Sequence, residues 1–194
     1  MTKTRLEAFS DGVLAIIITI MVLELKPPHG TSWEVIKPII PDLISYVISF
    51  CLIGIYWGNH HHLLQTVTQV NSKMIWANLH LLFWLSLTPF VTAWMGENNF
   101  SPITIAAYAG IQLLAGLAYY ILLTVIMNMT PKNSPLLIPL QKQAKKGLTS
   151  FLLFAAAIVG AFINSWISVI IFVLVAVSWW MPDRNIEKTI EKTD

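Results

Sequence analysis

The sequence predicts an all-α membrane protein with six spanning helices, on the evidence of its composition, its uncharged segments and its loop charges. Hydrophobic residues make up 56% of the 194 residues and charged residues 11%, against roughly 25% charged residues in a soluble domain. The mean hydropathy is +0.67. So few charged side chains cannot coat a soluble fold of this size. A single cysteine and a net charge of +2 also exclude a disulfide-stabilised secreted domain and a nucleic-acid-binding protein.

The spans follow from the stretches without Asp, Glu, Lys or Arg, because crossing the hydrocarbon core takes about 20 apolar residues. The first span tolerates Asp11 and ends near Glu24, the third lies before Glu97, and the fourth lies between Glu97 and Lys132. The last uncharged stretch, 147–182, holds 36 residues. It would be about 54 Å long as one helix, so a turn at its middle is predicted to divide it in two. The chain is thus one domain, 1–194, with spans at 6–25, 41–64, 73–95, 102–127, 143–163 and 166–182.

Local patterns refine these spans. Pro89 is expected to kink the third span. Pairs of small residues four positions apart predict close helix contacts. These pairs are Gly54/Gly58, Ala106/Gly110 and Ala156/Gly160. The mixed-charge tail 183–194 is predicted to be a frayed helix extension.

The basic residues predict that both termini are cytoplasmic, since cytoplasmic loops are enriched in Lys and Arg. With the N-terminus inside, the external segments hold only two basic residues, Lys26 and Lys37. The cytoplasmic segments then hold ten: Lys3, Arg5, Lys73, Lys132, Lys142, Lys145, Lys146, Arg184, Lys188 and Lys192. We therefore expect a multi-pass membrane protein in which an even number of spans returns the chain to the cytoplasm.

The first helix carries ionisable residues at its start and is then wholly apolar. At about 100° per residue, Ile16, Thr19, Ile20 and Leu23 share one face, and Asp11 lies about 140° from Ile16. A charge inside a span costs several kcal/mol unless it is paired. We therefore expect Asp11 to point toward other helices of the same subunit.

The polar residues at the cytoplasmic ends of the second and third spans are the expected partners of Asp11. They include Trp57, His60, His61 and His80. We predict a buried Asp11 carboxylate that accepts hydrogen bonds from imidazole and indole N–H groups and from Ser10. Arg5 is expected to pair with Glu7. Consecutive histidines splay about 100° apart on a helix, and no Cys or carboxylate stands at the spacing of a metal ligand, so no metal site is predicted.

Arg5, Phe9, Ser10 and Asp11, followed by an isoleucine-rich helix, resemble the signature motif of the transmembrane protein 175 family of lysosomal and prokaryotic potassium channels. The six spans, the cytoplasmic termini and the cluster after Trp57 fit the same family. The resemblance implies a potassium-preferring channel whose pore is lined by the first helix of each subunit. It places the constriction at Ile16 and further rings at Thr19, Ile20 and Leu23. A single-repeat chain resembles the prokaryotic homotetramers, with potassium as the permeant ion and no cofactor, and this form implies a prokaryotic plasma membrane.

A pore of this kind would work without the T-V-G-Y-G filter, which the chain lacks. Apolar rings at Ile16, Ile20 and Leu23 would extend over about 10 Å and would force an ion to shed water. Potassium loses its hydration more easily than sodium. Two alternatives are a secondary or proton-coupled transporter and a membrane scaffold without transport activity. The chain carries none of the common catalytic motifs, so an enzyme is not expected.

Overall fold

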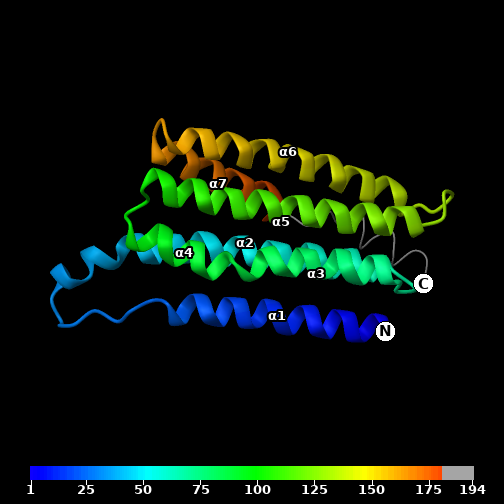
Figure 1. Cartoon of the computed structure of the whole chain (residues 1–194), viewed down its shortest axis with the longest axis horizontal. Helices are drawn as coiled ribbons and strands as arrows, with labels where there is room; N and C mark the ends of the chain where they lie inside the picture. The colour runs from blue at the N-terminus through cyan, green and yellow to red at the C-terminus, as the bar shows by residue number, and fades with distance from the viewer. Residues whose placement is uncertain (181–194) are drawn as a thin grey trace.

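A computed structural model describes residues 1–180 of the chain, which form an elongated bundle of helices (Figure 1). Residues 181–182 of the predicted sixth span and the tail 183–194 lie outside the described residues. The elements are α1 (Lys3–Leu23), the short 3₁₀ helices η1 (Trp33–Val35) and η2 (Lys37–Ile39), α2 (Ile40–Gln65), α3 (Ser72–Ser86), α4 (Thr88–Glu97), α5 (Pro102–Met129), α6 (Leu137–Ala161) and α7 (Ser165–Trp180).

The described helices match the predicted spans closely. Five apolar segments, at 3–23, 33–65, 72–97, 102–129 and 137–161, are long enough to cross a membrane, and α7 is a shorter apolar helix of 16 residues. The largest difference is at α6, which begins at Leu137 rather than at the predicted residue 143. Its first turns carry lysines, which the uncharged-segment criterion excludes although they are compatible with a helix.

The third span is interrupted, as Pro89 predicts. Helix α3 ends at Ser86, and α4 begins at Thr88 with the proline in its first turn. Proline fits the first turn because the N–H groups there have no partner within the helix. The N–H of Leu87 donates to the carbonyl oxygen of Trp84 at 3.2 Å and closes the end of α3.

Two apolar clusters hold the bundle together. One lies between α1, α2, α3 and α5 and includes Leu14, Ile53 and Leu122. The other lies between α2, α4, α5, α6 and α7 and is centred on aromatic rings, with the centroids of Tyr108 and Phe172 5.0 Å apart. Helix α1 packs against α2, α3 and α4. It lies at the edge of the bundle, on the side away from α6 (Figure 1).

The predicted small-residue contacts form at one pair and fail at two. A Cβ atom on Gly160 would lie 2.9 Å from Cγ2 of Ile167, so the glycine allows α6 and α7 to approach closely. A Cβ atom on Gly54, Gly58 or Gly110 would meet nothing within 4 Å. No neighbouring helix of the same chain closely approaches these glycines, because the spacing brings small residues to one face without specifying which helix covers that face.

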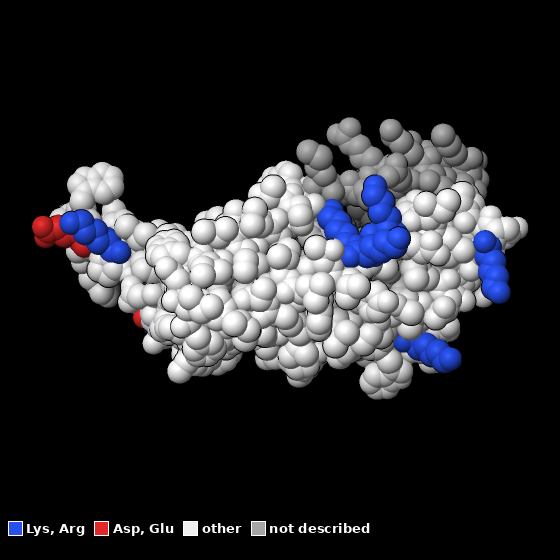
Figure 2. Space-filling model, turned by 90° about the horizontal axis from the view of Figure 1, so that it is seen from above, with Lys and Arg blue, Asp and Glu red and all other residues white. Residues whose placement is uncertain are grey.

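On the face that Figure 2 shows, charged residues lie at one end and in the half of the molecule toward the opposite end. The end that carries η1 and η2 presents one patch of both signs, and Lys and Arg are grouped toward the opposite end. The surface between them is uncharged, as expected of a bundle that crosses a membrane.

Candidate functional site

Helix α1 buries one face and exposes another, and the four predicted pore residues all lie on the exposed face. The exposed fraction is 60% for Ile16, 42% for Ile20 and 75% for Leu23. Thr19 is exposed too, and its Oγ1 donates to the carbonyl oxygen of Ala15 at 2.9 Å. The buried face consists of Leu6, Ser10, Leu14, Ile17 and Met21. The stripe is therefore free within the chain to meet lipid, another subunit or a pore.

Asp11 contacts Trp57, one of its predicted partners. The indole Nε1–H of Trp57, on α2, donates to Oδ1 of Asp11 at 2.9 Å, which confirms the expected contact within the subunit. The predicted burial of Asp11 is wrong, because its side chain is exposed. At about 100° per residue, Ser10 falls on the buried face of α1 and Asp11 falls at its edge.

Ser10 takes part in a separate, buried chain of hydrogen bonds. Its hydroxyl donates to the carbonyl oxygen of Leu6 at 2.8 Å and accepts from Nδ2 of Asn78 at 2.9 Å. The Asn78 Oδ1 atom lies 2.6 Å from Nε2 of His60. Since this amide oxygen can only accept, the Nε2 atom of His60 donates. The chain links α1, α3 and α2, so the predicted contact between Ser10 and Asp11 is replaced by one between Ser10 and Asn78.

The remaining predicted network residues have other hydrogen-bond partners or are exposed. His61 contacts Gln65, with Nε2 of each side chain 3.0 Å apart, and His80 accepts from Nε1 of Trp84 at 2.9 Å within α3. Phe9 is 51% exposed, on the same side of α1 as the predicted pore residues. Among the predicted partners that the structure describes, Trp57 therefore forms the hydrogen bond to Asp11, because a helix turns neighbouring polar residues to different faces.

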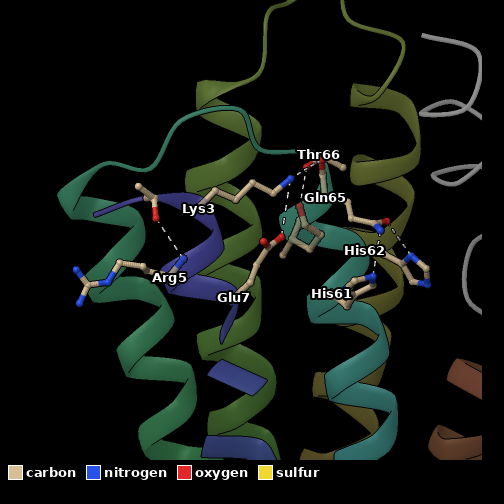
Figure 3. A network of polar contacts seen from close by, with 9 residues as sticks. Lys3, Arg5, Glu7, His61, His62, Gln65 and Thr66 are labelled. Atoms are coloured by element: carbon tan, nitrogen blue, oxygen red, sulfur yellow. Dashed lines mark hydrogen bonds and ion pairs between the residues drawn. The ribbon is translucent and has the colours of Figure 1, made fainter. Parts of the chain in front are cut away.

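The predicted ion pair between Arg5 and Glu7 is wrong. Glu7 pairs with Lys3, with Nζ and Oε1 3.8 Å apart, and Nζ of Lys3 also donates to the carbonyl oxygen of Gln65 at 3.2 Å. Figure 3 shows the Arg5 guanidinium pointing away from these groups. Residues four apart share a helix face and residues two apart do not, which explains the exchange of partners.

Carboxylates gather at the far end of α1, beyond Leu23. Glu24, Asp42 and Glu97 line a small pocket there. Lys26 donates from Nζ to Oε1 of Glu97 at 2.7 Å, and this hydrogen bond raises the pKa of Lys26 above its ordinary value. Three carboxylates beside one lysine attract cations to this end of α1.

A second buried polar cluster was not among the predicted site residues. The hydroxyl of Tyr119 donates to the carbonyl oxygen of Asn59 at 3.1 Å and accepts from Nε2 of Gln143 at 2.9 Å. The same Nε2 atom lies 3.3 Å from Oδ1 of Asn59. The signal in the sequence was the placement of amide side chains within apolar helices, where polar groups need partners.

A sequence profile described as the endosomal/lysosomal potassium channel TMEM175 matches residues 5–89, which include the Arg5-to-Asp11 motif and Trp57. A protein from Chryseobacterium sp. (strain P1-3), named a potassium channel, is 47% identical over 192 residues, covering 99% of this chain and 100% of the relative. The chain belongs to the TMEM175 family. This confirms the resemblance of the motif.

Solved structures extend the match to the fold of this TMEM175-family chain. The crystal structure described as a lysosomal potassium-selective channel TMEM175 homolog, from Chamaesiphon minutus, superposes with a TM-score of 0.79 at 27% identity, covering 91% of this chain and 95% of that chain. The six-helix fold class is thereby confirmed. The chicken protein named an endosomal/lysosomal proton channel is 32% identical over 101 residues, which are 46% of this chain and 20% of that protein.

Membership in TMEM175 settles the class of protein. It is a multi-pass membrane channel protein rather than an enzyme.

Proposed function

We propose that this TMEM175-family protein is a potassium-selective channel that assembles as a homotetramer, with the exposed face of α1 from each subunit lining the pore. The exposed stripe of Ile16, Thr19, Ile20 and Leu23 supports the proposal, because α1 stands at the edge of its own bundle with this face uncovered. One chain cannot enclose an axis with a single helix, so a closed ring of identical subunits is required.

The exposed carboxylate of Asp11 is the observation that carries this proposal. It lies eight residues after Lys3, the first residue of α1, which is about 12 Å along the helix axis. A carboxylate at this depth would be costly against lipid, and Trp57 supplies a single neutral hydrogen bond. A neighbouring subunit or an aqueous entrance at this end of α1 removes that cost.

Selectivity would come from dehydration. Rings of Ile16, Ile20 and Leu23 offer no oxygen ligands, so an ion that passes them loses part of its hydration shell. Potassium is more weakly hydrated than sodium, so the loss of this water costs potassium less free energy. The hydroxyl oxygen of Thr19 would replace part of the water that the ion loses. The carboxylates beyond Leu23 would concentrate cations at the outer end.

The relatives supply a second candidate ion. The chicken and human relatives are named proton channels, so proton permeation is the rival to potassium selectivity. The bacterial relatives are named potassium channels, and they match more of this chain. None of these names supports a coupled transporter or a scaffold.

Flux from liposomes tests the permeant ion. Purified protein should release potassium at least about tenfold faster than sodium, with a smaller proton flux at matched driving force. Proton flux that persists when potassium is absent and exceeds potassium flux would favour the proton channel. Saturating flux that is driven by a second ion gradient would favour a transporter, and no flux of any ion would favour a scaffold.

The assembly is tested separately by the mass of the detergent-solubilised particle. We expect four copies of the chain, in a prokaryotic plasma membrane with both termini in the cytoplasm. A monomer that still conducts ions would contradict an α1-lined pore.

A further inference from the structure

An open groove lies between α1 and α4, two helices that pack against each other. It contains about 820 Å³ of empty space that is continuous with the surface, and small-molecule sites have volumes of roughly 300–1,000 Å³. Helix α1 contributes Ile20 and Glu24 to the walls. The residues of the third span that line the groove are Ser86, Pro89, Phe90, Ala93, Trp94 and Glu97.

A pair of aromatic rings forms part of the wall. Phe90 and Trp94 lie one turn apart on α4, and their rings stack with centroids 5.9 Å apart and an interplanar angle of 26°. Phe90 is 65% exposed, so a molecule in the groove can contact its ring. The face of an aromatic ring carries partial negative charge and attracts a cation that lies over it. An aromatic wall therefore favours an organic cation over a hydrated inorganic ion, which gains little from apolar surface.

Two carboxylates mark the open end of the groove. Glu24 follows the last residue of α1, and Glu97 is the last residue of α4. Both are exposed, so this end of the groove is accessible from water. Pro89 precedes Glu97 by eight residues, which is about 12 Å along the helix axis. The groove thus has a negatively charged entrance and an apolar interior.

Lys26 compensates only part of this negative charge. Its Nζ atom donates to Oε1 of Glu97 at 2.7 Å, and Lys26 does not line the groove. The carboxylate of Glu24 has no hydrogen bond or ion pair with any residue that the structure describes. Two lining carboxylates beside one lysine leave one net negative charge, and Asp42 adds another in the small pocket that shares Glu24 and Glu97 with the groove.

We propose that this groove binds a free organic ammonium ion, with its positive charge between Glu24 and the ring of Phe90 and its apolar part against Ile20. The chemistry of the walls selects this class of ligand. An anion would be repelled by the carboxylates, and a neutral apolar molecule would gain nothing from them. The site is distinct from the candidate pore, and binding requires no ion conduction.

Equilibrium dialysis of the purified full-length protein in detergent tests this proposal, with phenyltrimethylammonium as the ligand. This cation keeps its charge at every pH, and tert-butylbenzene is an uncharged molecule of the same shape. We expect saturable binding of one phenyltrimethylammonium ion per chain. An equal concentration of tert-butylbenzene should not displace the ion, because the uncharged molecule lacks the attraction to Glu24 and to the aromatic face.

Two variants with matched controls locate the site. Glu24→Gln should weaken binding about fivefold, and Phe90→Leu should weaken it about threefold. Glu34→Gln removes an exposed carboxylate of η1 outside the groove, and Phe83→Leu removes a ring that is 55% exposed on α3 and does not line the groove. Both controls should bind the cation as the wild type does. All four side chains are exposed, so the substitutions are compatible with the fold.

Four results would overturn the proposal. Displacement by tert-butylbenzene would show an apolar groove without charge selection. Unchanged binding to the variant E24Q/F90L would place the cation elsewhere. One bound ion for several chains would place it on a symmetry axis between subunits rather than in a groove of each chain. The absence of saturable binding would show that the groove does not hold this class of ligand. None of these results depends on whether the protein conducts potassium.

Discussion

Ser10 and Asp11 are adjacent in sequence and occupy different environments. The Ser10 hydroxyl is buried and bonded to Asn78, and the Asp11 carboxylate is exposed and bonded to Trp57. Two neighbouring polar residues thus fasten α1 to α3 on one side and to α2 on the other. These contacts hold the helix in place without using its exposed apolar face.

A double-mutant cycle tests the contact between Asp11 and Trp57. Asp11→Ala and Trp57→Phe each remove the same hydrogen bond, so the double variant should be less destabilised than the two single effects added together, with a coupling of about 1 kcal/mol. The free energy of unfolding in detergent measures it. Asp11→Ala should also reduce the fraction of assembled oligomer. Strictly additive effects would show that the contact does not stabilise the protein.

The buried hydrogen bonds through Asn78 should contribute more to the free energy of unfolding than the contact between Asp11 and Trp57. Asn78→Ala leaves the Nε2–H of His60 without its acceptor, and an unsatisfied buried group costs about 1–3 kcal/mol. The free energy of unfolding should fall by this amount. The control Asn98→Ala removes an exposed side chain that donates a hydrogen bond to the carbonyl oxygen of Trp94. This variant should change the free energy of unfolding by about 0.5 kcal/mol or less. Equal effects at the two positions would contradict the role of Asn78.

At the scale of elements, the α6–α7 hairpin depends on one close approach. Gly160→Ala places a methyl group 2.9 Å from Cγ2 of Ile167, and such overpacking costs about 1–3 kcal/mol. Gly110→Ala meets nothing within 4 Å, and it should be neutral or stabilise α5 by up to about 1 kcal/mol, since alanine favours helix. Unfolding of both variants in detergent measures the difference. A stabilising Gly160→Ala would contradict the packing of α6 on α7.

The sequence predicted the elements better than the contacts between them. Uncharged stretches and Pro89 located the helices and the interruption of the third span, because burial in lipid constrains composition directly. To predict which residues contact Asp11, Arg5 and Gly54, one must know how each helix is rotated about its axis relative to its neighbours. A one-residue difference, such as that between Ser10 and Asp11, turns a side chain by about 100°. The lysines of α6 belong to the helix although they fall outside the uncharged stretch.

At the scale of the whole molecule, α1 is placed differently from α5. Helix α5 packs against α3, α4, α6 and α7, and α1 lies at the edge with an apolar face uncovered. A ring of subunits that meet through α1 would cover this face.

The reversal potential under potassium/sodium bi-ionic conditions tests the central claim most directly, in planar bilayers with wild-type protein, Ile16→Asn and the control Ile170→Asn. Ile170 is 57% exposed on α7, comparable to the 60% of Ile16, and is not expected to face the pore. We predict a potassium-selective potential for the wild type and the control. Ile16→Asn should lose most of this selectivity or conduct more, because a polar ring no longer forces dehydration. Unchanged selectivity and conductance in Ile16→Asn would contradict a pore lined by α1.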